Sequence, residues 1–329
     1  MKRRQFISLF GGAAAMWPLA ARAQPSERIR RVAILMPYHP TDEEMQGRVR
    51  ALRQELGKLG WTAGVNIQFD ERWTSDNMDL VRANAAGLLE LKPDVVVAVG
   101  GRVIPILMQL TRTVPIIIPG AGDPVVSGWV ESLARPGGNV SGFTFFESSV
   151  IAKYLETLKQ IAPGISRVAI IYNPDNATGA IYSRLFETFA RSLSIEPTVA
   201  PTRGIGDIDR AIESLAQHQN GGAFFYPDLT TNALRDQVTA IVARRRVPAI
   251  YSDRLIVVSG GLVSYDADRL DIFRRSGSYV DRVLRGEKPG DLPFQQPTKY
   301  QLTINLKTAK AMGLEIPASV LALADEVIE

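Results

Sequence analysis

The chain has 329 residues, of which 46% are hydrophobic and 22% charged, and it contains two histidines and no cysteine. This composition is typical of a globular protein and excludes collagen-like and intrinsically disordered chains. The absence of cysteine excludes disulfides, thiolate zinc sites and cysteine nucleophiles, and two histidines cannot form a multi-histidine metal site. The length predicts roughly two domains.

The first 23 residues predict a secretory signal peptide. They contain a basic start, an apolar stretch over residues 6–20 and the small-x-small sequence ARA before the expected cleavage site. The apolar stretch is too short to span a bilayer, so cleavage is favoured over a retained membrane anchor. The sequence RRQFI also matches a twin-arginine export signal, while Sec export stays open. No cysteine follows the cleavage site, so we expect no lipid anchor.

The net charge of +4 lies entirely in this predicted signal. Four of the 38 basic residues and none of the 34 acidic residues fall within residues 1–23, so the rest of the chain is formally neutral. A neutral chain gives no reason to expect nucleic acid or an anionic membrane as a partner. We therefore expect a soluble protein of the periplasm that acts as a monomer.

From residue 30 the chain alternates short β-branched runs with amphipathic stretches, which predicts parallel sheets covered by helices. Thr41 or Asp42 is positioned to cap the first helix, and Gly60 is positioned to end it. In the first half, the pattern predicts strands at 31–36, 66–70, 94–99 and 114–119, and helices at 42–59, 78–91 and 103–111.

The second half of the chain repeats this plan. RVAIIY at 167–172 matches RVAILM at 31–36, and a helix at 177–193, GAFFY at 222–226 and VPAIY at 247–251 follow in the same order. The remaining segments predict a strand at 261–265, a helix at 269–285, a Gly/Pro-rich link at 286–297, and a final strand and helix over 300–313. They are too short for a third domain, so we expect them to complete the two lobes.

We therefore predict an α/β fold with two doubly wound, Rossmann-like lobes joined by a hinge that the chain crosses several times. Lobe 1 is expected to contain residues 30–143 and about 266–292, and lobe 2 residues 147–264 and about 298–329. The crossings are expected at 142–148, 264–266 and 293–297. Such a hinge would let the lobes close around a ligand.

Ligands of open α/β sheets bind beyond the carboxyl ends of the strands. This rule nominates the loops after the predicted strands, together with the first crossing. Our candidate ligand-binding residues are Tyr38, Gly100, Gly101, Arg102, Asp123, Phe143, Asn173, Tyr226, Asp228 and Tyr251.

The chemistry of the first-lobe loop 100–102 fits a carboxylate. Gly100 and Gly101 either present backbone N–H groups to the ligand or form a plain turn. Arg102 either clamps an anionic group or points to solvent.

The acidic and amide candidates have local alternatives. Asp123 and Asn173 either contact the ligand or satisfy their own helix or turn. Asp228 is favoured as a ligand contact because it ends an apolar strand abruptly. The aromatic candidates, which stack on a planar ligand or belong to the core, are Tyr38, Phe143, Tyr226 and Tyr251.

The chain lacks the usual catalytic signatures. It has no G-x-S-x-G, no G-x-G-x-x-G, no Walker A sequence and no H-E-x-x-H. We therefore expect no enzymatic activity, no cofactor and no metal.

Long stretches of the chain resemble a known family, among them DPVVSGWVESLARPGGNVSGFT, SGGLVSYDAD and GEKPGDLPFQQPTKYQLTINLKTAKAMGLEIP. With these stretches the chain is similar to substrate-binding components of ABC importers of the tryptophan/tyrosine-binding-protein-like family, which have the type I periplasmic-binding fold. The resemblance implies capture of a small organic solute, an amino acid or an aromatic or carboxylate compound, and its delivery to a membrane permease with its ATPase. Relatives usually carry a small hydroxyl residue and a proline where this chain has Gly101-Arg102-Val103, so the resemblance does not fix the ligand.

Three other functions compete with this one. A binding subunit that feeds a sensor would have the same sequence features. An exported α/β hydrolase would need a nucleophile and a base, for which the chain offers few candidates. A transcription regulator with a similar two-lobed core would need a DNA-reading headpiece, and the export signal occupies that place.

Overall fold

The computed structural model describes residues 28–75, 77–147, 149–176 and 178–329. The predicted signal peptide, residues 1–23, therefore lies outside the described residues, as does the expected first residue of the helix at 177–193. Within the described ranges, we find no helix with both the length and the apolar character needed to cross a membrane.

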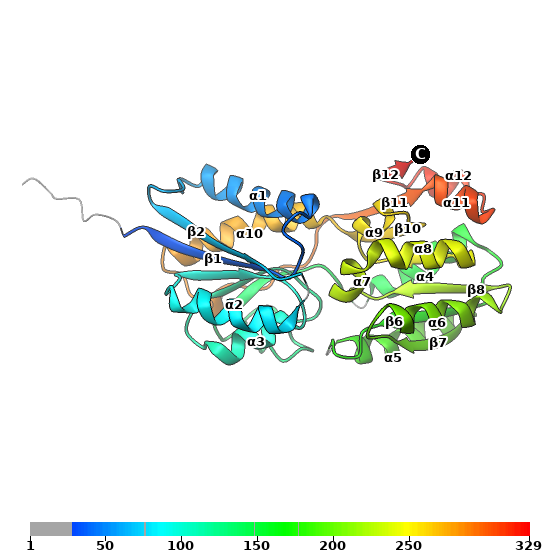
Figure 1. Cartoon of the computed structure of the whole chain (residues 1–329), viewed down its shortest axis with the longest axis horizontal. Helices are drawn as coiled ribbons and strands as arrows, with labels where there is room; N and C mark the ends of the chain where they lie inside the picture. Colours follow the sequence, from blue (N-terminus) through cyan, green and yellow to red (C-terminus); the bar gives the residue numbers. More distant parts are fainter. Residues whose placement is uncertain (1–27, 76, 148, 177) are drawn as a thin grey trace, which may run out of the picture.

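A parallel sheet of five strands forms the framework of lobe 1 (Figure 1). Its strand order is β2-β1-β3-β4-β5, and each pair of neighbours is parallel. The β-branched runs VVVA and III lie in its buried central strands. The strands are β1 (Arg30–Met36), β2 (Ile67–Trp73), β3 (Val95–Ala98), β4 (Ile116–Ala121) and β5 (Val140–Thr144).

Lobe 2 contains a seven-stranded sheet with the order β12-β11-β10-β9-β8-β6-β7. The five strands β7-β6-β8-β9-β10 repeat the order of the first sheet and are parallel. This repetition confirms the predicted α/β fold with two doubly wound lobes. The strands are β6 (Arg167–Tyr172), β7 (Glu196–Pro201), β8 (Gly221–Phe225), β9 (Ala249–Tyr251), β10 (Val263–Ala267), β11 (Tyr300–Asn305) and β12 (Glu326–Ile328).

Helices cover both faces of each sheet. In lobe 1, α1 packs against α10 and α2 against α3; in lobe 2, α4 packs against α5 and α6 against α8. The helices of lobe 1 are α1 (Glu43–Lys58), α2 (Met78–Glu90), α3 (Val103–Leu110) and α10 (Arg269–Leu284), with the short η1 (Pro289–Asp291). Those of lobe 2 are α4 (Val150–Ile161), α5 (Gly179–Ser192), α6 (Ile205–Ala216), α7 (Leu229–Ala233), α8 (Arg235–Arg245), α9 (Arg254–Val258), α11 (Leu306–Met312) and α12 (Ala318–Leu321).

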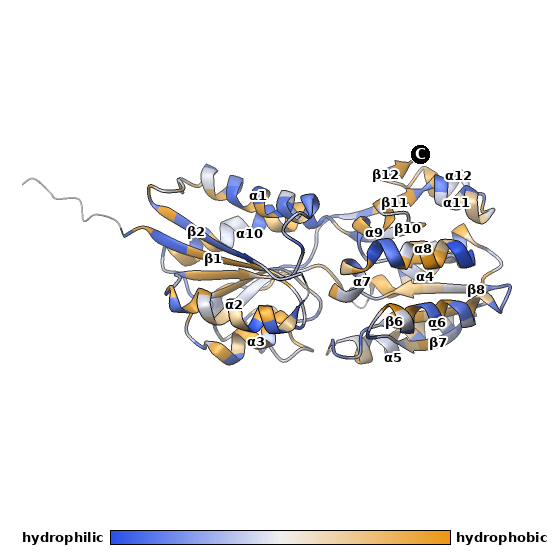
Figure 2. Ribbon diagram, in the orientation of Figure 1, coloured by the Kyte–Doolittle hydropathy of each residue, from blue (hydrophilic) through white to orange (hydrophobic). Residues whose placement is uncertain are grey.

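Local sequence explains how these helices start and which face they bury. Of the two possible caps, Thr41 and Asp42, it is the Asp42 side chain that caps α1, by accepting a hydrogen bond from the Met45 N–H at 3.1 Å. Apolar residues at helical spacing, Val49, Leu52 and Leu56, turn the same helix toward the core of lobe 1. Figure 2 shows the resulting pattern, with hydrophobic colour along the strands and hydrophilic colour on α1 and α8.

The first crossing differs from the prediction. Residues 142–148 were expected to form it, but residues 140–144 form the edge strand β5, which pairs with β4. Gly142 interrupts the apolar pattern of this strand, so the sequence did not predict it. The structure requires glycine at this position because an added Cβ would lie 2.2 Å from the Ile118 carbonyl oxygen. The chain leaves lobe 1 only after Thr144.

The chain passes between the lobes three times. It enters lobe 2 after β5, returns to lobe 1 between β10 and α10, and enters lobe 2 again between η1 and β11. A backbone hydrogen bond from the Thr144 N–H to the Gln295 carbonyl (2.8 Å) ties the first of these segments to the third. These connections make the hinge.

Candidate functional site

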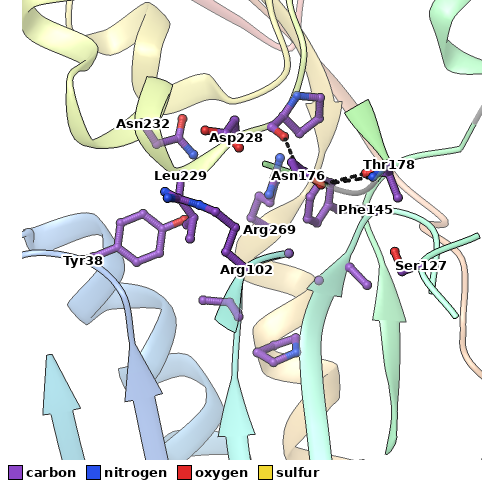
Figure 3. A pocket seen from close by; sticks show the side chains of 18 of the residues that line it. Tyr38, Arg102, Ser127, Phe145, Asn176, Thr178, Asp228, Leu229, Asn232 and Arg269 are labelled. Carbon is purple, nitrogen blue, oxygen red and sulfur yellow. Dashed lines mark hydrogen bonds between the residues drawn. The ribbon is translucent and has the colours of Figure 1, made fainter. Parts of the chain in front are cut away.

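A pocket lies between the two lobes, where the carboxyl ends of their strands face each other (Figure 3). Its volume of about 60 Å³ exceeds what a single water needs. In both sheets the strand order reverses beside the strands that reach the pocket, which is where open α/β sheets bind ligands. Six of the ten candidate residues line it: Tyr38, Gly100, Gly101, Arg102, Tyr226 and Asp228.

Glycines after β3 let lobe 2 approach the backbone of lobe 1 closely. Gly100 has φ +106°, and an added Cβ would lie 2.7 Å from Cδ1 of Leu229 in lobe 2. At Gly101 an added Cβ would lie 3.1 Å from Oδ1 of Asn176, also in lobe 2. A Cβ at either position would therefore require the facing side chain of lobe 2, Leu229 or Asn176, to move.

Arg102 crosses from lobe 1 to lobe 2. Figure 3 shows its side chain reaching toward the segment with Asp228 and Leu229, and its Nη2 donates to the Thr230 hydroxyl at 3.2 Å. Asn173 does not line the pocket, but its Nδ2 donates to the same hydroxyl at 3.1 Å while its Oδ1 accepts the Asp175 N–H. Asn173 therefore positions Thr230, the residue that Arg102 contacts.

Asp228 lines the pocket and also starts α7. Its Oδ1 accepts the Thr230 N–H at 2.8 Å, so the side chain is a helix cap. Burial raises the pKa of the Asp228 carboxyl, while the Thr230 N–H and the charge of Arg102 act in the opposite direction. One oxygen of the Asp228 carboxylate is therefore already hydrogen-bonded within lobe 2.

Asp123 lies beside the pocket and does not line it. Its Oδ1 accepts the N–H groups of Val125 and Val126, the local role that the sequence left open. Its Oδ2 accepts the Tyr182 hydroxyl of lobe 2 at 3.1 Å. Asp123 therefore joins the two lobes.

The two tyrosines of the pocket, Tyr38 and Tyr226, come from opposite lobes. The Tyr226 hydroxyl donates to Oγ1 of Thr178 at 2.9 Å, and burial raises the pKa of Tyr226 far above its ordinary value. Burial, together with the charge of Asp253, also raises the pKa of Tyr38. Both phenols are therefore neutral hydrogen-bonding groups at neutral pH.

Phe143 and Tyr251 do not stand in the pocket, and the stacking role expected for them is corrected. Phe143 lies in β5, 1% exposed, with its ring centroid 4.8 Å from that of Tyr279. Tyr251 ends β9, fully buried, and its ring stacks on Phe225 at 4.9 Å. Phe143 is buried because it lies inside β5, and Tyr251, at the last position of β9, packs into the core of lobe 2.

Several pocket residues were missed by the sequence reasoning. Phe145, two residues beyond Phe143, takes the expected aromatic place, and the Arg269 guanidinium lies over its ring at 3.8 Å (Figure 3). The segment 143–146 contains three phenylalanines, Phe143, Phe145 and Phe146, so the sequence alone does not decide which of them reaches the pocket. The other missed residues of the pocket wall include Arg48, Thr178 and Asn232.

A buried ionic cluster supports one side of the pocket. Arg48 of lobe 1 and Asp253 of lobe 2 are 3.4 Å apart, with side chains 4% and 1% exposed. Arg269 approaches the other carboxylate oxygen of Asp253 at 3.9 Å and donates to the Ser252 carbonyl at 2.8 Å. Burial would raise the pKa of Asp253, but the two guanidiniums hold it below its ordinary value.

Asp266 completes this cluster. Burial, with the nearby charge of Asp253, raises its pKa to about 7. Its Oδ2 accepts the Arg254 N–H at 3.0 Å. Within the described ranges, no three His, Asp or Glu side chains come close enough together to hold a metal ion.

Comparison with known proteins places the chain in a family. The model of the family described as "ABC transporter substrate binding protein" matches residues 32–328. A "Tyrosine-binding protein" of Clostridioides difficile (strain R20291) is 27% identical over 281 residues, which cover 84% of this chain and 79% of that protein.

Solved structures show the same fold. An ABC domain from Streptococcus pneumonia in complex with L-Trp has a TM-score of 0.83 and 21% identity and covers 92% of this chain and 100% of its own. A ligand-free, open substrate binding protein with adhesive properties from Clostridium difficile has a TM-score of 0.68 and 22% identity and covers 91% of this chain and 99% of its own. The two lobes and their multiple connections therefore form a type I periplasmic-binding fold. The chain belongs to the ABC transporter substrate binding protein family.

Proposed function

We propose that the protein captures a small organic solute, an amino acid or an aromatic or carboxylate compound, between its two lobes. The observation that carries this proposal is the pocket at the strand ends of both sheets, which takes its walls from both lobes. The solute is then delivered to the membrane permease of an ABC importer, which an ATPase drives. The family membership and the binding named for its relatives, tyrosine and L-Trp, support this proposal.

The chemistry of the walls fits such a solute. Arg102 and Arg269 offer forked N–H donors that suit a carboxylate. Tyr38, Phe145 and Tyr226 offer flat apolar surfaces with two hydroxyl groups. The site would bind its ligand by contact and hydrogen bonding, with no catalytic step.

Closure of the lobes would trap the solute. The proposed moving units are residues 30–143 with 266–292 and residues 147–264 with 298–329. Polar contacts that already join them in this structure include Arg102 to Thr230, Tyr182 to Asp123, Arg235 to Asp42 and Arg48 to Asp253. Each contact would break when the lobes separate, so together they favour the closed form.

The proposed place of action is the periplasm. The predicted signal peptide would direct export and be removed, leaving a monomer without a membrane anchor. Release of the mature protein by osmotic shock, with the amino terminus at Gln24, is the expected result. Retention in the membrane fraction would contradict this part of the proposal.

Mass spectrometry of small molecules that co-purify with the protein tests the capture of a solute. We expect a bound organic compound that denaturation releases. The sample is then unfolded, refolded without ligand and titrated with the compound identified. A compound that co-purifies but fails to rebind the refolded protein would contradict capture in the pocket.

A further inference from the structure

The charged side chains that line the pocket are strongly biased toward one sign. Among the described residues of the pocket wall, three are arginines, Arg48, Arg102 and Arg269, and one is acidic, Asp228. The three arginines belong to different elements of lobe 1, namely α1, the β3–α3 loop and the start of α10. Their convergence on one pocket is a property of the fold and not of a local charge run.

The nearby carboxylates already have partners. Asp228 caps α7 through the Thr230 N–H. Asp253, behind the wall, is shared by Arg48 at 3.4 Å and Arg269 at 3.9 Å, and it also accepts the Leu255 N–H and the Asn232 amide. An ammonium group of a ligand would be repelled by the three guanidiniums. The carboxylates of Asp228 and Asp253 would offset this repulsion only in part.

Two guanidiniums of the pocket wall have a buried donor without an acceptor. The Nε–H groups of Arg48 and Arg269 are buried and find no hydrogen-bond acceptor among the described residues. A buried donor without an acceptor costs free energy, and more so when it is charged. A carboxylate oxygen in the pocket would supply an acceptor together with a compensating charge.

The wall also contains aromatic side chains. Phe145 presents its ring to the Arg269 guanidinium, and Tyr38, Trp129 and Phe273 line neighbouring positions. Such walls favour a flat apolar body attached to the acidic group.

From these observations we infer that the pocket selects an organic acid that carries a carboxylate and no ammonium group, with an aromatic ring as its apolar part. This inference rests on the proposed function and narrows it. It departs from the amino acids named for the relatives, which carry both charges.

Binding to a matched series of probes tests this selection. The ligand-free, refolded protein is titrated by calorimetry with phenylpyruvate, L-phenylalanine and phenethylamine, which share a phenyl ring and differ in the carboxylate and ammonium groups. We expect phenylpyruvate to bind at least tenfold more tightly than L-phenylalanine, and phenethylamine to bind most weakly.

Substitutions at Arg102 show whether the guanidiniums cause the preference. Arg102→Gln should weaken phenylpyruvate binding at least tenfold and bring its affinity close to that of L-phenylalanine. Arg102→Lys, which keeps the charge, should retain the preference for the acid. The control is Arg244→Gln, which removes an arginine that pairs with Asp209 on the surface of lobe 2, and it should bind as the unmodified protein does.

The outcomes separate the two proposals. If L-phenylalanine or phenethylamine binds as tightly as phenylpyruvate, or if Arg102→Gln keeps the full preference, the inference about ligand charge is overturned while solute capture stands. If the refolded protein binds none of the three probes and also fails to rebind its co-purifying compound, solute capture and the inference both fail. If the co-purifying compound rebinds and contains an amino group, only the inference fails.

Discussion

Gly100 combines an unusual backbone conformation with a close contact between the lobes. Its φ of +106° lies in a region that disfavours residues with a Cβ, at a cost of roughly 1–2 kcal/mol. An added Cβ would also lie 2.7 Å from Cδ1 of Leu229, so this side chain of lobe 2 would have to move. Backbone geometry at this residue therefore acts on stability and on ligand affinity at once.

Gly100→Ala is expected to weaken the binding of the co-purifying solute at least tenfold, measured by calorimetry. Gly64→Ala is the matched control, because Gly64 also has a positive φ, +78°, but has no neighbour within 4 Å of an added Cβ. Gly64→Ala should lower the melting temperature by a comparable amount and leave affinity unchanged. Equal affinities for the two variants would contradict the role assigned to Gly100.

Asp266 makes stability depend on pH. Its pKa rises from 3.8 to about 7 in the folded protein, so between these values the native state binds a proton that the unfolded state has lost. The free energy of unfolding therefore falls as pH rises through this window.

Asp266→Asn removes the ionisable group and keeps an oxygen for the Arg254 N–H. The variant should be more stable than the unmodified protein at pH 8, on the order of 1–2 kcal/mol, and of similar stability at pH 5. Urea unfolding at the two pH values measures both differences. If the variant is less stable at pH 8 than the unmodified protein, ionisation of Asp266 does not destabilise the native state, and the prediction is wrong.

At the scale of elements, the amino-terminal turn of α1 docks on lobe 2. Asp42 caps α1 through one carboxylate oxygen, and the other lies 3.0 Å from Nη2 of Arg235, the first residue of α8. Further along α1, Arg48 pairs with Asp253 of lobe 2. With Glu44, which lies 3.8 Å from Arg254 of lobe 2, α1 and its cap residue thus carry three ionic contacts that require the lobes to be close.

Arg235→Gln is expected to weaken binding of the co-purifying solute about fivefold, which corresponds to the roughly 1 kcal/mol of a partly buried ion pair. The substitution leaves the cap of α1 intact. Arg245→Gln is the control on the same helix, since Arg245 pairs with Glu213 inside lobe 2 at 2.9 Å. If both variants bind the solute equally well, the ion pair between Asp42 and Arg235 does not contribute to closure.

Local sequence signals predict many of the individual elements. The run RVAIIY forms a strand over residues 167–172, as predicted. Short runs rich in β-branched residues are typical of parallel strands that are buried on both faces. The edge strand β5 escaped prediction because Gly142 interrupts its apolar pattern, and the need for this glycine comes from β4, a neighbour in space.

At the scale of the whole molecule, the repeated order of sequence segments predicts the two lobes, and the strand orders confirm them. The rule that ligands bind at strand ends led to Gly100, Arg102 and Asp228 in the pocket wall. Arg48 and Arg269 were not predicted to line the pocket because each lies on a helix. Only the packing of α10 against α1 brings both to the same pocket. That packing depends on contacts between residues far apart in the chain, which no local pattern records.

Ligand binding should stabilise the molecule as a whole, because both lobes contribute to one pocket. A solute at 100 times its dissociation constant adds about 2.7 kcal/mol to the free energy of unfolding. The melting temperature of the refolded protein is therefore a direct measure of capture.

The most direct test is a thermal unfolding series on refolded, ligand-free protein against amino acids, aromatic acids and other carboxylates. We predict that at least one of these solutes raises the melting temperature, that Gly64→Ala keeps the shift, and that Gly100→Ala loses most of it. A protein whose melting temperature no such solute raises, or a Gly100→Ala variant with an undiminished shift, would contradict capture of a small solute between the lobes.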